Sequence, residues 1–291
     1  MLKDRSDAYL RWLNLAEESV KRCNYEKAAC LYRYVAVHFG LLNDQDNLKK
    51  FAIKAGECYL DAGKNLWDSN KPLKALLSFI KASHCFKEGC DKQGVKKCDL
   101  IINSYYDSIR KGEVTESRNN AYDLKRIGDY FMDYDPQKAI ECYEYAAKKA
   151  LEDGKLNLSG SLYGILGECY IKLKNHEAAA ESYARSADMY YACRKLFEAA
   201  WRFCISAFQF ILSGRTEKAL SMANKAEDVC REGEINVILN DLASIGKSLS
   251  EGKTQEAERI WNKIRMKFKK NYIKLVDSCF HSVNSNQVTA S

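Results

Sequence analysis

One small residue recurs at a fixed interval along the second half of the chain. Ala139, Ala179 and Ala219 are forty positions apart, and Ala257 follows thirty-eight positions later. Each alanine is the fourth residue of a segment with helical apolar spacing. A helical unit this short cannot bury its apolar face alone, so its repetition predicts helix pairs that stack on one another. We therefore expect a helical solenoid, and such surfaces usually bind other proteins.

The unit around residues 163–187 shows how the expected helix pairs pack. Tyr163 and Tyr170 flank the Leu-Gly pair that ends at Gly167, and Ala179 and Tyr183 follow. This spacing matches the tetratricopeptide repeat pattern. A glycine lets the second helix approach the first closely, the alanine offers a small facing surface, and the tyrosines fill the remaining space.

The apolar spacing is close to 3.6 residues along the whole chain, and no segment has the alternation of a strand. The predicted fold is all-α: a right-handed superhelical α-solenoid of tetratricopeptide-like helix pairs with a C-terminal helical cap. Residues 1–281 are expected to form one solenoid, and the polar residues 282–291 a flexible tail. Helices are predicted at 4–22, 25–38, 45–67, 72–88, 92–111, 119–132, 136–152, 157–173, 176–192, 195–213, 215–231, 235–250, 253–268 and 270–281.

Composition points to a soluble intracellular protein. The charged N-terminus leads directly into an amphipathic pattern, so no signal peptide is expected, and no apolar run is long enough to span a bilayer. None of the twelve cysteines forms a Cys-x-x-Cys pair, which favours buried, reduced thiols. We expect a cytoplasmic protein that can make peripheral contact with membranes.

The net charge of +7 comes from one short stretch, which runs from Arg259 to Lys274. It contains seven basic residues and no acidic ones, while the remaining 39 basic residues balance the 39 acidic residues. Two interpretations stay open: the stretch caps the solenoid, or it binds anionic lipid or an acidic partner. Nucleic acid is disfavoured, because the aromatic residues of the stretch are needed for packing. The stretch contains Arg259 and the predicted patch residues Lys263, Arg265, Lys267, Lys269, Lys270 and Lys274.

No motif indicates catalysis, a cofactor or a metal. His84, Cys85, Cys90 and Cys98 do not have the spacing of a zinc site. Gly246-Lys247-Ser248 imitates the end of a phosphate-binding loop, but Asp241 stands where the partner glycine would be needed. We therefore predict a protein that is not an enzyme and needs no cofactor.

The inner face of the predicted solenoid is expected to include eight residues from the first helices of the repeats. A clamp for a peptide carboxylate would need several Lys, Arg and Asn donors there. Trp201, Cys204 and Ala243 stand where donors would be wanted, so this binding mode is not expected. The predicted inner residues are Lys125, Asp129, Gly164, Glu168, Cys204, Phe208, Ala243 and Lys247.

Three stretches resemble the SNAP family, the soluble attachment proteins that couple membrane-fusion SNARE complexes to an AAA+ ATPase. They are residues 135–147, residues 198–207, and residues 47–59 with the helix that follows. The resemblance implies an adaptor in vesicle-mediated transport that binds a SNARE-type helical bundle and presents it to the disassembly ATPase. By position, the implied partner-binding residues are Lys125, Arg126, Lys148, Lys149, Lys172, Arg185, Arg202 and Lys225.

Two features depart from that family. Its animal members insert an aromatic loop between the first two helices into the membrane, whereas here only residues 22–24 connect those helices. Residues 286–291 contain no leucine like the one that family members use to stimulate the ATPase. The alternative is a general tetratricopeptide scaffold that binds a peptide or protein without SNARE or ATPase coupling.

Overall fold

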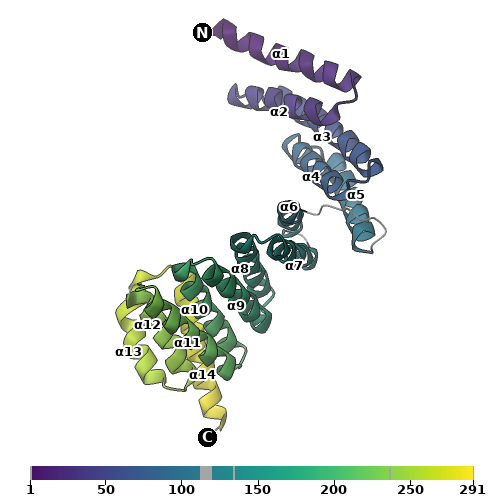
Figure 1. Ribbon diagram of the computed structural model, residues 1–291. Helices are drawn as coiled ribbons and strands as arrows, with labels where there is room; N and C mark the ends of the chain where they lie inside the picture. Colours follow the sequence, from purple (N-terminus) through teal and green to yellow (C-terminus); the bar gives the residue numbers. More distant parts are fainter. Residues whose placement is uncertain (1, 112–119, 134, 236, 291) are drawn as a thin grey trace. The chain divides into compact units, whose positions relative to one another are not determined.

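The computed structural model describes residues 2–111, 120–133, 135–235 and 237–290, with side chains from residue 9 to residue 284. The described residues form helices and turns and contain no strand, and within each unit most successive helices pack against one another as antiparallel neighbours (Figure 1). The all-α solenoid prediction is thus confirmed. Internal contacts divide the chain into two compact units, Met1–Tyr130 and Phe131–Ser291. The single solenoid over residues 1–281 stays a prediction.

In unit 1, α2, α3 and α5 begin at side-chain caps, and helices pack through small residues. Asn24 and Asp44 each accept a hydrogen bond from a main-chain N–H of the first turn, which satisfies one of its unpaired donors. Gly63 lies so close to Phe79 that a Cβ there would come within 2.3 Å of the ring. The helices are α1 (Leu2–Lys21), α2 (Tyr25–Leu41), α3 (Gln45–Asp68), α4 (Pro72–Glu88), α5 (Lys92–Arg110) and α6 (Ala121–Phe131), whose last residue belongs to unit 2.

Unit 2 has a more regular repeat. Five successive helices have 17 residues each, and α7, α9 and α11 begin forty positions apart, as the alanine period predicts. Gly154 and Gly214 have positive φ at the turns, where glycine has no Cβ to clash. The helices are α7 (Pro136–Glu152), α8 (Leu156–Lys172), α9 (His176–Ala192), α10 (Leu196–Leu212), α11 (Thr216–Glu232), α12 (Val237–Ser250), α13 (Thr254–Ile264) and α14 (Lys270–Ala290), with a short 3₁₀ turn, η1 (Arg265–Lys267), before α14.

Three successive helices of unit 2, α8, α9 and α10, are each linked to the preceding helix by a buried serine. Its hydroxyl donates to a main-chain carbonyl of the preceding helix, so the polar group costs little when it is buried. These bonds fix the distance between neighbouring helices. The pairs are Ser159 with Ala147 (3.0 Å), Ser186 with Gly160 (2.6 Å) and Ser206 with Ala180 (2.8 Å).

The predicted C-terminal cap is present, but its first helix is shorter than expected. We predicted a helix over 253–268, whereas α13 ends at Ile264. Phe268 takes an extended conformation, which turns its ring onto Trp201 and Trp261. The helix therefore ends early because packing of the Phe268 ring stabilises the extended conformation more than the local apolar spacing favours a continued helix. α14 then contacts α10, α12 and α13, and it continues to Ala290, beyond the predicted end at residue 281. The side chains of residues 285–291, in the predicted tail, lie outside the described part.

Candidate functional site

A cleft of about 570 Å³ opens in unit 2. Its lining comes from α8, α10 and α14, with two residues from α9. Here α8 and α10 are the first helices of successive pairs, so the cleft lies on the face where a solenoid usually receives a partner. The lining residues are Glu168, Ile171, Lys172, His176, Tyr183, Trp201, Arg202, Ile205, Gln209, Leu212, Asn271, Tyr272, Lys274, Leu275 and Ser278.

The apolar part of the cleft follows from the spacing of residues along α10. Trp201, Ile205 and Leu212 stand at four- and seven-residue steps, so they share one face of the helix. The Trp201 ring meets Tyr272 of α14 edge-on at 4.7 Å and stacks on Phe268 at 6.2 Å. These aromatic contacts hold α14 against α10, so α14 forms one wall of the cleft.

The polar part of the cleft carries more positive than negative charge. Lys172, Arg202 and Lys274 line it together with one carboxylate, Glu168. The guanidinium of Arg202 lies over the ring of Tyr183, 5.3 Å from its centre. Burial raises the pKa of Tyr183 well above its ordinary value, and the nearby carboxylate of Glu168 raises it further. The tyrosine therefore stays neutral and leaves the excess positive charge uncompensated.

One buried amide in the cleft was not anticipated from the sequence. Gln209 is only 1% exposed, and its Oε1 lies 2.8 Å from Nδ1 of His176. The signal was present, because a lone amide within the apolar run Phe208–Phe210 must find a partner when buried. This hydrogen bond joins α9 to α10 at the cleft.

The structure brings together residues from two separate predictions. Lys172 and Arg202 were predicted as partner-binding residues and Lys274 as part of the basic patch, and all three line the cleft. The cleft therefore combines positive charge with buried aromatic surface. Such a cleft can bind an acidic, partly apolar segment of another molecule.

The other predicted partner-binding residues lie elsewhere. Lys125 pairs with Asp129 at 2.8 Å in unit 1, and Arg126 is exposed on the same helix, α6. Lys148 is exposed on α7, where Lys149 contacts Glu152 and Asp153 at the helix end. Arg185 lies over Tyr163, 5.6 Å from the ring centre, and Lys225 lies 3.5 Å from Asp188. None of these six lines the cleft.

Ion pairs between α9 and α11 explain why several basic residues are engaged there. Glu177 accepts hydrogen bonds from Arg215 at 3.1 and 3.2 Å and from Lys218 at 3.4 Å. Lys218 also reaches Glu181 at 3.2 Å. These exposed pairs favour the register of the two helices and leave less free charge for a partner on this side.

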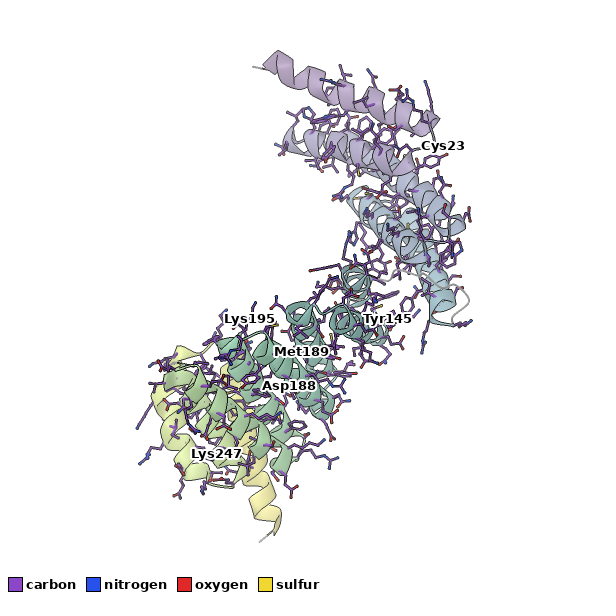
Figure 2. The ribbon with its side chains drawn as sticks, in the orientation of Figure 1. Cys23, Tyr145, Asp188, Met189, Lys195 and Lys247 are labelled. Carbon is purple, nitrogen blue, oxygen red and sulfur yellow. The ribbon has the colours of Figure 1, made fainter. Side chains whose placement is uncertain are left out.

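Two residues predicted on the inner face point in another direction. Lys247 of α12, which is labelled in Figure 2, donates a hydrogen bond to Glu227 of α11 at 2.8 Å. Cys204 is buried, and burial, with the neighbouring Cys230 of α11, raises the pKa of its thiol. Lys247 therefore faces α11, and Cys204 belongs to the same buried core cluster as Cys230. Spacing along one helix identifies a face but does not say which neighbour covers it.

Apart from Lys274, which lies on α14, the basic patch lies at the turn from α13 to α14 and not on one continuous helix. Lys263, Arg265, Lys267, Lys269 and Lys270 are exposed between the end of α13 and the start of α14. Arg265 pairs with Asp277 of α14 at 2.5 Å, and the indole N–H of Trp261 donates to the same carboxylate at 2.9 Å. The turn is thereby anchored to both helices.

Neither a metal site nor a membrane span emerges from the described residues. Across those ranges, no three His, Cys, Asp or Glu side chains come together in a way that could hold a metal ion. No described helix is long and apolar enough to cross a lipid bilayer.

Comparison with known proteins places this fold among helical-repeat proteins of tetratricopeptide type. Over 96% of this chain, the structure resembles the tetratricopeptide-repeat sensor protein of the STAND class from Pyrococcus horikoshii, with a TM-score of 0.50, 17% identity and coverage of 44% of that chain. No protein-family model matches the sequence.

Within that class the sequence is similar to two alpha-soluble NSF attachment proteins. It is 25% identical to the alpha-soluble NSF attachment protein of Saccharomyces cerevisiae over 191 residues, which are 64% of this chain and 61% of the yeast protein. It is 30% identical to the protein of the same name from Vitis vinifera over 116 residues, covering 38% and 37% of the two chains. The chain thus spans less than two thirds of either relative.

Proposed function

We propose that this protein is a non-enzymatic, cytoplasmic SNAP-like adaptor in vesicle-mediated transport. It binds a SNARE-type helical bundle and presents it to an AAA+ disassembly ATPase. The single observation that supports the binding role is the cleft in unit 2, where Lys172, Arg202 and Lys274 outnumber Glu168 beside an aromatic wall. The similarity to two alpha-soluble NSF attachment proteins supports the choice of partner.

The charge of the cleft favours acidic helices as the partner. Cations on α8, α10 and α14 stand at fixed spacing, because all three helices are held by packing. Rigid helices lose little conformational entropy on binding, so many weak polar contacts add up when the partner is itself preformed. An assembled bundle meets this condition and its separate strands do not.

The first experiment compares binding to an assembled SNARE-type four-helix complex with binding to its unassembled strands. We expect tighter binding to the assembled complex, and weaker binding as salt rises. Equal binding to both forms would instead favour a general tetratricopeptide scaffold. The rate at which the ATPase disassembles the bound complex, with and without this protein, tests the presentation step.

The variants test whether the cleft carries the interaction. Lys172→Glu and Arg202→Glu should together weaken binding at least tenfold, because they place two carboxylates where the partner's acidic groups would lie. Arg202→Glu removes the contact of Arg202 with Tyr183, and this loss could impair folding of the double variant. The single variant Lys172→Glu keeps that contact and tests the cleft independently. Lys195→Glu is the matched control, since Lys195 is exposed at the start of α10 outside the cleft (Figure 2). Unchanged binding by both the double variant and the single Lys172→Glu variant would contradict a role for the cleft.

A further inference from the structure

The turn between α13 and α14 combines positive charge with an exposed apolar side chain. We call residues 263–270 the basic turn. Met266 lies at the centre of the basic turn and is 89% exposed, although its side chain is apolar. Lys267 follows it directly, and Lys263, Lys269 and Lys270 are exposed nearby. An apolar group surrounded by cations in this way is typical of surfaces that meet a membrane.

The basic turn is held in a defined conformation. Phe268 points inward and contacts Trp201 and Trp261, with ring centres 6.2 and 5.6 Å apart. Arg265 is tied to Asp277 at 2.5 Å. Because these two contacts fix the ends of η1, Met266 and Lys267 project from a rigid base and need little ordering on binding.

We infer that the basic turn docks on an anionic lipid surface, with its lysines over the headgroups and Met266 entering the interface. This goes beyond the proposed function and deepens the peripheral membrane contact expected from the sequence, by naming the element and its apolar contact. It does not require the cleft. Lipid is favoured over nucleic acid, because Trp201, Trp261 and Phe268 stack on one another and are not available to bases. Lipid is favoured over an acidic protein by Met266, which a purely ionic contact would leave in water.

The experiment measures partition of the full chain onto vesicles of phosphatidylcholine alone and with about 30 mol% phosphatidylserine. We expect binding to the anionic vesicles only, with loss at high salt. Lys267→Glu, Lys269→Glu and Lys270→Glu combined should lower the partition coefficient by about 100-fold or more, since each basic residue near such a surface contributes roughly fivefold. The matched control reverses three exposed lysines of α5, Lys92, Lys96 and Lys97, and should bind like the wild type.

A second variant separates the apolar contact from the charge. Met266→Ser should weaken binding about tenfold while leaving its dependence on salt unchanged, because only buried apolar area is lost. Val237→Ser, at another exposed apolar residue, should have no effect. Circular dichroism checks that each variant is folded.

Several results would overturn the inference. They are equal binding to neutral and anionic vesicles, no binding to either, or a lysine variant that binds like its α5 control. Binding to polyglutamate in place of vesicles would assign the turn to an acidic protein. These outcomes are separable from failure of the adaptor function, because the Lys172→Glu variant should bind vesicles normally and the basic-turn variant should keep the cleft intact.

Discussion

The thiol of Cys279 donates a hydrogen bond to the main-chain carbonyl of Phe208 across 3.4 Å, although 71 residues separate the two. Both residues are fully buried where α14 lies against α10. The contact shows that the last helix completes the core of the preceding repeats and forms one wall of the cleft. Stability and the shape of the cleft therefore depend on the same interface.

Enlarging the side chain at this contact should loosen α14. We expect Cys279→Leu to lower the free energy of unfolding by about 1–3 kcal/mol, because the extra carbons have no space against α10. Urea unfolding followed by circular dichroism measures the change. Cys193→Leu, at a half-exposed site after α9, should be close to neutral. Equal effects of the two substitutions would mean that α14 is not tightly packed.

Two glycines of the repeat should respond oppositely to alanine. At Gly167 a Cβ would lie 2.6 Å from the ring of Tyr183, whereas at Gly246 the nearest atoms, on Ala207 and Ala223, are an ordinary 3.6 Å away. Gly167→Ala should therefore destabilise the protein by about 1–3 kcal/mol. Gly246→Ala should be neutral or stabilise it by up to about 1 kcal/mol through better helix propensity. Thermal unfolding of both variants checks the prediction, and a stabilising Gly167→Ala would contradict it.

Acid should weaken the ion pairs between α9 and α11. The hydrogen bond from Arg215 holds the pKa of Glu177 below its ordinary value of 4.5, and Lys218 adds to this effect. The folded protein therefore binds the proton less tightly than the unfolded chain, so this contribution is present above pH 4.5 and is lost as the pH falls through the lowered folded pKa.

The test of this pH dependence is Glu177→Gln. We expect a lower Tm than wild type at pH 7 and a difference that disappears in acid or at high salt. Glu217→Gln is the control, since it occupies the equivalent position of α11 forty residues later and no ion pair is shown for it. A Tm difference that persisted at pH 3 would assign the effect of Glu177 to packing.

Cysteine reactivity should separate into a fast and a protected class. Burial raises the pKa of Cys85 and of Cys98 to about 12, so their thiolate fraction is roughly 1000-fold below that of a thiol with pKa 9.0. Cys23 and Cys90 are exposed. Labelling with a thiol-disulfide reagent at pH 8 should modify the exposed pair first, and Cys23→Ser with Cys90→Ser should remove most of the fast phase. A fast phase that survived both substitutions would show that buried helices open readily.

Local spacing was enough to predict where most helices begin and end. The predicted bounds of α4, α7 and α9 agree with the structure, because apolar steps of three and four residues and the turn signals around Gly154 and Gly214 act within one helix. The predicted helix over 45–67 also agrees with α3, which has 24 residues and ends one residue later. The 3.6-residue pattern failed at Ile264, where packing of the distant Trp201 ring on Phe268 ends the helix early.

The sequence by itself determined the all-α repeat, its forty-residue period and the segments that turn. Only the tertiary structure decided which of many similar basic residues share a cleft, placing Lys172 and Arg202 there and leaving Lys148 and Lys225 outside. Only the tertiary structure also shows that a Cβ would clash at Gly167 and would fit at Gly246. The physical reason is that helix formation depends on neighbours along the chain, whereas a cleft depends on contacts such as that of Phe208 with Cys279, which no local period encodes.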